Sequence, residues 1–291
     1  MKLQQSATMV RSNEVHENRY MTTLRYKSLF ISDTHLGLRA SRTEYLLDFL
    51  KHTDSDNLYL VGDILDFWKM RSGWYWPTIN NEIVQQIITK AKQGTRVIYV
   101  PGNHDELLRD YLNFHVSGIE IRKEVIHTTE DNRRFLVLHG DEFDGVVMNK
   151  KWLAHLGSDA YDLLLWLNRW FNVARRRLGF GYWSLSAYLK NQVKEAVKYI
   201  GNFEQAVIHT VHERNLDGVI CGHIHHAVIS DMEGLTYANC GDWVESCTAL
   251  AEEPDGSLKL IRWIDDSMNL LDEKEKAYAH SDSDGRVVST S

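Results

Sequence analysis

Residues 29–37 read LFISDTHLG, and this short stretch decides how the rest of the chain is interpreted. It begins with an apolar run that is typical of a buried strand, and Asp33 and His35 follow the run directly. Because side chains alternate along an extended segment, Asp33 and His35 are expected on one side, where both can reach one centre or two neighbouring ones. In open α/β sheets, functional sites lie where strands end in this way.

Four more apolar runs end in side chains that can bind a metal ion. These runs are residues 58–61, 97–100, 135–138 and 218–221, and we interpret each as a buried strand. The polar side chains that follow the five predicted strands are Asp33, His35, Asp63, Asn103, His104, Asp105, His139, Asp141, His223 and His225. Since loops that leave the carboxyl ends of strands converge, these side chains are expected to form one site.

The spacing of apolar residues indicates the fold class. Helical periodicity at residues 45–50 and 83–91 separates the first three strands, which predicts βαβ units and a largely buried sheet. The runs at 228–229, 235–237 and 258–261 are joined by short turns, which predicts an antiparallel section. The sequence therefore predicts an α/β fold with an added antiparallel section.

Composition excludes several classes of protein. The chain has 291 residues, of which 43% are hydrophobic and 25% are charged, as in an ordinary globular protein and unlike a disordered or disulfide-rich one. The net charge is −7, so attraction to an anionic surface requires a local basic patch. The three cysteines form no CxxC pair, which favours a reducing compartment and predicts a cytoplasmic location.

The chain divides into a central domain and two polar ends. Residues 1–25 contain no apolar stretch of the kind found in signal peptides, and we expect a disordered arm or the product of an upstream start. Residues 272–291 are predicted to be a disordered tail. The central domain is predicted over residues 26–271, with a helical insertion at about 143–215 that we call the cap.

The predicted ligands are too many for a single metal ion. Asp33, His35, Asp63, Asn103, His139, His223 and His225 supply oxygen and nitrogen donors without thiolate. Such a set suits Mn, Fe or Zn better than Ca, Mg or Cu(I). Asp63 follows a glycine and has no adjacent histidine, so it is the natural bridge between two ions about 3.5–4 Å apart. By contrast, isolated histidines such as His127 are expected on the surface or in the core.

Five short motifs resemble those of calcineurin-like metallophosphoesterases in order and spacing. They are Asp33-Thr34-His35, Gly62-Asp63, Gly102-Asn103-His104-Asp105, His139-Gly140 and Gly222-His223-Ile224-His225. The resemblance implies a four-layer αββα sandwich and a two-metal hydrolase. It also implies one metal bound by Asp33, His35, Asp63 and His225, and a second bound by Asp63, Asn103, His139 and His223.

The resemblance further implies catalytic roles for His104 and Asp105. His104 would contact the phosphate or protonate the leaving oxygen, and Asp105 would orient the His104 ring. Two other carboxylates, Asp66 and Asp141, are expected to support the ligands from behind, although an exposed loop position suits Asp66 almost as well.

Within the superfamily, residues 30–37 (FISDTHLG) and 62–68 (GDILDFW) resemble the UDP-2,3-diacylglucosamine pyrophosphatase group of lipid A biosynthesis. The helical insertion between His139 and His223 is also similar. The chain departs from that group at His104, because the pyrophosphatase typically carries Arg after the metal-binding Asn. The resemblance is therefore to the pyrophosphatase-like branch.

The cap carries the basic charge of the chain. Residues 150–200 contain nine basic and three acidic residues, a net charge of +6, together with Trp152, Trp166, Trp170 and Trp183. Two interpretations stay open: the tryptophans form a core with a solvated charged face, or the cap binds an amphipathic anionic substrate at a membrane surface. Lys190 and Lys194, four residues apart, either bind a substrate phosphate or form a solvated pair.

These observations predict an enzyme that hydrolyses the pyrophosphate bond of a UDP-linked acylated glucosamine with two divalent ions, with Mn preferred over Fe or Zn. The alternative is a metallophosphoesterase for another phosphomonoester, phosphodiester or nucleotide, and a non-catalytic scaffold with the same fold is a third hypothesis. A nucleotide-linked or lipid-like substrate is expected, at the inner face of the membrane. We expect no nucleic-acid partner, because a nuclease needs a groove that follows several phosphates, and the sequence indicates no protein partner.

Overall fold

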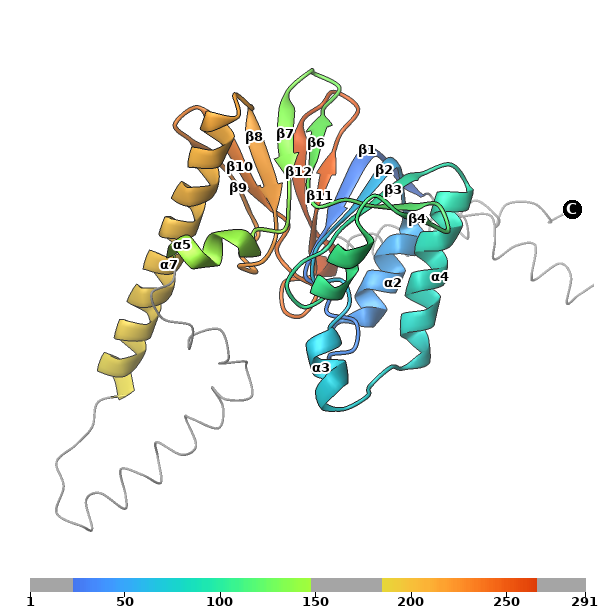
Figure 1. Cartoon of the computed structure of the whole chain (residues 1–291), viewed down its shortest axis with the longest axis horizontal. Helices are drawn as coiled ribbons and strands as arrows, with labels where there is room; N and C mark the ends of the chain where they lie inside the picture. The colour runs from blue at the N-terminus through green and yellow to red at the C-terminus, as the bar shows by residue number, and fades with distance from the viewer. Residues whose placement is uncertain (1–22, 148–184, 266–291) are drawn as a thin grey trace, which may run out of the picture. The chain divides into compact units, whose positions relative to one another are not determined.

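The computed structural model describes residues 23–147 and 185–265, which form two β-sheets with helices (Figure 1). The first sheet has seven strands, in the order β12 (Leu258–Arg262), β11 (Thr248–Glu252), β1 (Leu24–Ile31), β2 (Thr53–Val61), β3 (Arg96–Val100), β5 (Ile119–Ile121) and β4 (His115–Val116). The second has five, in the order β6 (Val125–Thr128), β7 (Arg134–Val137), β8 (Gly218–Cys221), β10 (Leu235–Asn239) and β9 (Val228–Met232). The prediction of an α/β fold is confirmed.

The helices alternate with the first strands, as the periodicity predicted. The α-helices are α2 (Thr43–His52), α3 (Phe67–Ser72), α4 (Thr78–Lys92), α5 (Asp144–Val147) and α7 (Leu185–Glu213). Two 3₁₀ helices are η1 (Glu106–Tyr111) and η2 (Asp141–Phe143). Strands β1, β2 and β3 are parallel neighbours, with α2 and α4 in the connections between them. This is the predicted pair of βαβ units.

The antiparallel section is divided between the two sheets. Strands β9 and β10 pair antiparallel in the second sheet, whereas β11 and β12 pair antiparallel at one edge of the first. Strand β1 begins at Leu24, inside the predicted N-terminal arm. The rest of that arm, the predicted tail and the cap tryptophans lie outside the described residues.

Two apolar cores hold the layers together. Helix α2 buries Leu46, Leu47, Phe49 and Leu50 in a cluster that also contains residues of α4 and the first sheet. A second cluster joins the two sheets, with Phe30 and Tyr59 from the first and Phe135 from the second. The rings of Phe30 and Tyr59 are stacked, with centroids 4.6 Å apart. Cys221, Cys240 and Cys247 are buried and form no disulfide bond with one another.

Residues 140–215 form a compact unit separate from the rest of the chain. Within this unit, the Phe143 ring packs edge-on against Phe203, and the Tyr199 hydroxyl donates a hydrogen bond of 2.8 Å to Asp144 Oδ1. The unit overlaps the predicted cap, of which residues 148–184 lie outside the described residues. Among the helices that the structure describes, none is both long and apolar enough to cross a membrane.

Candidate metal centre

The structure places all seven predicted metal ligands just after the carboxyl ends of strands. They follow β1 (Asp33 and His35), β2 (Asp63), β3 (Asn103), β7 (His139) and β8 (His223 and His225). In each sheet these strands run parallel to one another, so their carboxyl ends point the same way. The loops that carry the seven side chains therefore meet at one edge of the two-sheet core.

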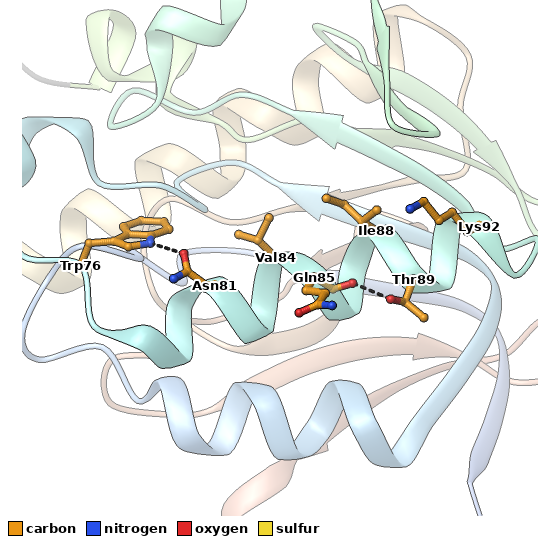
Figure 2. A pocket seen from close by; sticks show the side chains of 7 residues that line it. All are labelled: Trp76, Asn81, Val84, Gln85, Ile88, Thr89 and Lys92. Carbon is orange, nitrogen blue, oxygen red and sulfur yellow. Dashed lines mark hydrogen bonds between the residues drawn. The ribbon is translucent and has the colours of Figure 1, made fainter.

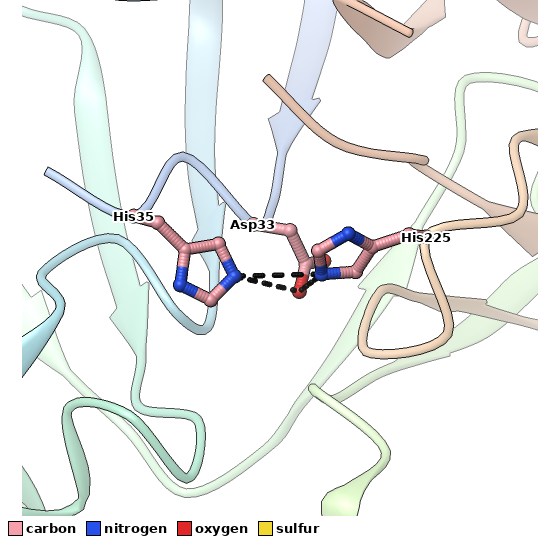
Figure 3. A group of neighbouring side chains, drawn as sticks. All are labelled: Asp33, His35 and His225. Atoms are coloured by element: carbon pink, nitrogen blue, oxygen red, sulfur yellow. Dashed lines mark hydrogen bonds and ion pairs between the residues drawn. The ribbon is translucent and has the colours of Figure 1, made fainter. Parts of the chain in front are cut away.

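The first group of ligands contains Asp33, His35 and His225 (Figure 3). Nε2 of His225 lies 3.2 Å from Oδ1 of Asp33, and Nε2 of His35 lies 3.9 Å from the same oxygen. The two Nε2 atoms are 3.4 Å apart. Two imidazole nitrogens and a carboxylate oxygen that converge in this way are a donor set for one transition-metal ion or zinc.

The second group contains Asp63, His139 and His223. Oδ2 of Asp63 lies 3.4 Å from Nε2 of His139 and 3.9 Å from Nε2 of His35, which belongs to the first group. The other oxygen, Oδ1, accepts a hydrogen bond of 2.8 Å from the backbone N–H of His104. One oxygen of Asp63 thus faces both groups, which is the placement that a bridging ligand needs.

Hydrogen bonds behind the ligands set which ring nitrogen faces the centre. Nδ1 of His139 lies 3.0 Å from the carbonyl oxygen of Val61, and a carbonyl can only accept, so Nδ1 carries the proton. Nδ1 of His35 lies 3.2 Å from Oδ2 of Asp66 in the same way. Both rings therefore turn Nε2 toward the centre, the orientation that metal-binding histidines have.

Asn103 provides a test of whether these residues fit a metal ion. Its Oδ1 is buried and has no hydrogen-bond partner among the residues that the structure describes. Buried amide oxygens are nearly always hydrogen-bonded, so an unsatisfied one requires an explanation. A cation is the partner that the surrounding carboxylates and imidazoles fit, and the site residues are thus compatible with divalent metal ions.

The backbone at the centre is strained. Asp33, His35, Asp63, His223 and His225 all have positive φ, between 47° and 71°. Non-glycine residues rarely adopt this left-handed conformation, and such residues cluster at functional sites. These five residues lie in the turns that follow the strands, where the left-handed conformation helps to aim the ligand side chains.

Two motif glycines allow the backbone to approach the ligands. A Cβ atom on Gly102 would lie 2.3 Å from Oδ1 of Asp63, and one on Gly222 would lie 2.4 Å from Oδ2 of Asp33. Neither ligand can move away freely, because Asp63 and Asp33 accept backbone hydrogen bonds from His104 and His223. A larger residue at either glycine would therefore displace a ligand.

His104 is held by Asp66 and not by Asp105, which corrects the predicted role of Asp105. Nδ1 of His104 lies 3.1 Å from Oδ1 of Asp66, and Asp66 is buried rather than an exposed loop carboxylate. The Asp105 carboxylate instead accepts hydrogen bonds from the backbone N–H groups of Gly102 and Ile64 and from the Tyr99 hydroxyl. Asp105 therefore stabilises the loops through these bonds, and Asp66 is the carboxylate beside the imidazole.

Neighbouring charged groups shift the pKa values of the carboxylates and histidines at the centre. Burial raises the pKa of Asp63, but His139 and His35 outweigh this effect and hold the pKa well below its ordinary value. Burial lowers the pKa of His225, but Asp33 outweighs it and raises the pKa to about 9. Burial and the nearby Asp63 charge raise the pKa of Asp105 above its ordinary value. The carboxylates that face the ligand nitrogens are thus the ones kept ionised.

Other candidate residues lie elsewhere in the chain. Lys190 and Lys194 are in α7, in the unit 140–215, and the Lys194 side chain is exposed, so their phosphate-binding role stays a prediction. Asp141 is in η2 of the same unit. A pocket of 360 Å³ lies along α4 (Figure 2), lined by residues from Trp76 to Lys92, and it contains none of the seven ligands.

The family model for calcineurin-like phosphoesterases matches residues 26–227, more than half of the chain. The chain belongs to this family. The resemblance read from the five motifs is confirmed, and this calcineurin-like phosphoesterase is a metal-dependent hydrolase.

Similar proteins include several named UDP-2,3-diacylglucosamine hydrolase. The one from Haemophilus influenzae (strain PittGG) is 26% identical over 230 residues, which are 74% of this chain and 90% of that protein. The one from Neisseria gonorrhoeae is 27% identical over 224 residues, which are 74% of this chain and 89% of that protein. The similarity therefore extends over nearly the whole length of these relatives, at low identity.

Proposed function

We propose that this phosphoesterase hydrolyses the pyrophosphate bond of a UDP-linked acylated glucosamine with two divalent ions, Mn in preference to Fe or Zn. The observation that carries the proposal is the shared placement of Asp63, whose Oδ2 faces both groups of ligands. The substrate class is supported by relatives named UDP-2,3-diacylglucosamine hydrolase, which this chain matches over most of their length.

The first group of residues would bind one ion through Asp33, His35 and His225, and the second would bind another through Asn103, His139 and His223. Divalent ions at such a centre supply Lewis-acid stabilisation of the phosphoryl oxygens and activation of water. Asp66 holds Nδ1 of His35, and the carbonyl of Val61 holds Nδ1 of His139. The Nε2 atom of each ring is therefore the one turned toward a metal ion.

His104 is the proposed acid. Its Nδ1 faces Asp66, so Nε2 is the nitrogen that points toward the centre, 4.0 Å from Oδ2 of Asp63. Burial lowers the pKa of His104, but Asp66 and Asp63 outweigh it and raise the pKa above its ordinary value. A proton on Nε2 can therefore be donated to the leaving oxygen, while Nδ1 of the resulting neutral ring stays beside the Asp66 carboxylate, 3.1 Å from its Oδ1.

The location and partners follow from the same substrate. A UDP-linked acylated glucosamine is amphipathic and anionic, so the enzyme would act in the cytoplasm at the inner face of the membrane, with the basic cap as the contact. Neutralising Arg175, Arg176 and Arg177 together should then weaken sedimentation with anionic vesicles at low salt. Equal sedimentation of the wild type and the triple variant would remove the membrane contact from the proposal.

A hydrolysis screen with Mn²⁺ tests the substrate. The substrates are UDP-2,3-diacylglucosamine, bis-p-nitrophenyl phosphate and a cyclic nucleotide, and we expect the highest kcat/KM for the first. Because His104 is the residue of the wider superfamily, the alternative is another phosphoester or nucleotide, which a higher kcat/KM on the other substrates would establish. A metal analysis that finds no bound ion, together with no hydrolysis, would leave a non-catalytic scaffold.

A further inference from the structure

Trp68 lies directly against His104, although it belongs to none of the five motifs. It is the second residue of α3, the helix whose first turn is capped by Asp66 through a hydrogen bond of 2.8 Å from the N–H of Lys69. The Trp68 and His104 ring centroids are 4.3 Å apart, and the rings are inclined by only 33°. The indole is 40% exposed, so it forms the outer cover of the imidazole.

Three different groups surround the His104 ring. The carboxylate of Asp66 holds its Nδ1, and the ring of His35 meets it edge-on, with centroids 4.6 Å apart and an angle of 87°. Trp68 covers it from a third direction, with the two rings tilted by 33°. Asp66 holds only one atom of the imidazole, and His35 has its own hydrogen bond to Asp66 and its own place in the first ligand group. Trp68 is therefore the neighbour whose removal would let the ring turn outward.

We propose that Trp68 is a positioning residue that holds the His104 imidazole with Nδ1 on Asp66 and Nε2 toward the metal centre. This inference rests on the proposed phosphoesterase function, since positioning matters only if His104 serves the reaction. The side chain of His104 is 22% exposed and is carried by the loop after β3, so the loop alone leaves it room to move. The indole supplies the restraint from the solvent side.

Displacement of a catalytic group by about 1 Å can cost about 10²-fold in rate. We therefore expect Trp68→Ala to lower kcat for bis-p-nitrophenyl phosphate by about 10- to 100-fold, with KM nearly unchanged. Trp68→Phe keeps a flat ring in contact with the imidazole and should retain most of the activity. Trp74→Ala is the matched control, because Trp74 is on the same segment, is 77% exposed and pairs with Trp76 rather than with His104.

A double-mutant cycle separates positioning from a general structural role. If Trp68 acts through His104, then the variant that combines Trp68→Ala with His104→Ala should be no slower than His104→Ala alone. Losses that multiply would overturn the proposal, because they would show that Trp68 contributes independently of His104. Unchanged kcat in Trp68→Ala would overturn it as well.

The contact itself can be measured without activity. In ¹³C-histidine-labelled protein stripped of divalent ions, the His104 resonance is identified by its absence from the spectrum of His104→Gln. The ring current of Trp68 should shift this resonance, and Trp68→Ala, but not Trp74→Ala, should remove the shift. A His104 resonance that does not respond to Trp68→Ala would refute the contact. Absence of hydrolysis in the wild type would refute the proposed function and leave this measurement as the test of the contact.

Discussion

A buried network between the two sheets, away from the metal ligands, allows a quantitative test of the fold. Glu252 of β11 is almost fully buried, and its Oε2 accepts hydrogen bonds from Ser28 Oγ at 2.7 Å and from His127 Nε2 at 2.9 Å. Its Oε1 accepts a hydrogen bond of 2.8 Å from the backbone N–H of Glu130. His127 is bonded in turn to the Tyr59 hydroxyl at 2.9 Å. We use Glu252→Gln as the perturbation, because it keeps the shape and removes the charge.

The expected loss follows from the three hydrogen bonds. A hydrogen bond to a charged group contributes about 1.5–3 kcal/mol, against about 0.5–1.5 kcal/mol for a neutral pair. A glutamine has a single acceptor oxygen, so it cannot satisfy Ser28, His127 and the Glu130 N–H as the carboxylate does. Some of these hydrogen bonds can form again in the variant if the His127 tautomer changes. Glu252→Gln should therefore lower the free energy of unfolding by only about 2 kcal/mol at neutral pH.

The loss should depend on pH with a definite sign. Burial raises the pKa of Glu252, but the bonds from His127, Ser28 and the Glu130 N–H outweigh it and leave the pKa below the ordinary 4.5. A group with a lowered folded-state pKa stabilises the protein above its unfolded-state pKa, and this contribution is lost as the pH falls through the folded-state value. The difference between wild type and Glu252→Gln should therefore be full near neutral pH and shrink below about pH 4.5.

Urea unfolding followed by circular dichroism, at matched metal concentration and at several pH values, measures this difference. At neutral pH the midpoint should move by roughly 1 M urea, given slopes of about 1–3 kcal/mol per M. Metal binding also changes with pH, but Glu252 is not a ligand, so that effect cancels between the two proteins. A difference that stays constant from neutral to acidic pH, or no difference at neutral pH, would refute the role assigned to the network.

The other predictions concern the metal centre and are measured by metal analysis and by hydrolysis of a small diester. Asp63→Ala should lose both ions together with all activity, because Oδ2 faces both groups; one full equivalent of metal with substantial turnover would exclude a bridge. His104→Ala should keep both ions and lower kcat by about 10²–10⁴-fold, and loss of metal with unchanged kcat in the remaining holoenzyme would contradict its role. Gly102→Ala should lose metal, because the added methyl would lie 2.3 Å from Oδ1 of Asp63 and 2.7 Å from the backbone nitrogen of Asp63; wild-type metal content would contradict this close contact.

The regular part of the fold could be predicted from the sequence, whereas strand β11 could not. The βαβ units are visible because apolar strands and amphipathic helices of ordinary length alternate there. Strand β11 (Thr248–Glu252) has the sequence TALAE, which contains two alanines and has no strand-like periodicity. It is a strand because all five residues are buried between β1 and β12, so long-range packing overrides local preference. The same long-range pairing separated the antiparallel section into two sheets.

The supporting residues of the site were harder to predict than its ligands. Ligand types recur after each strand, so the pattern shows in the sequence. The family resemblance implied that Asp105 orients the His104 ring, but the turn directs the carboxylate inward to Tyr99 and to backbone N–H groups. For Asp66 two alternatives were expected, a place behind the ligands or an exposed loop position; it is buried, caps α3 and lies beside both His35 and His104.

The convergence of the ligands has a different cause from the one predicted. Alternation along an extended segment was expected to place Asp33 and His35 on one side, but both have positive φ, and so do His223 and His225. Left-handed residues are unfavourable in isolation, so surrounding bonds must hold them. The N–H of Asp33 donates to the carbonyl of Gly62 at 3.0 Å, and the N–H of His35 donates to that of Asp63 at 2.9 Å. Because these bonds join the first two loops through their backbones, the ligand positions are set by the folding of the sheet edge, and the ions would bind to a site that is already formed.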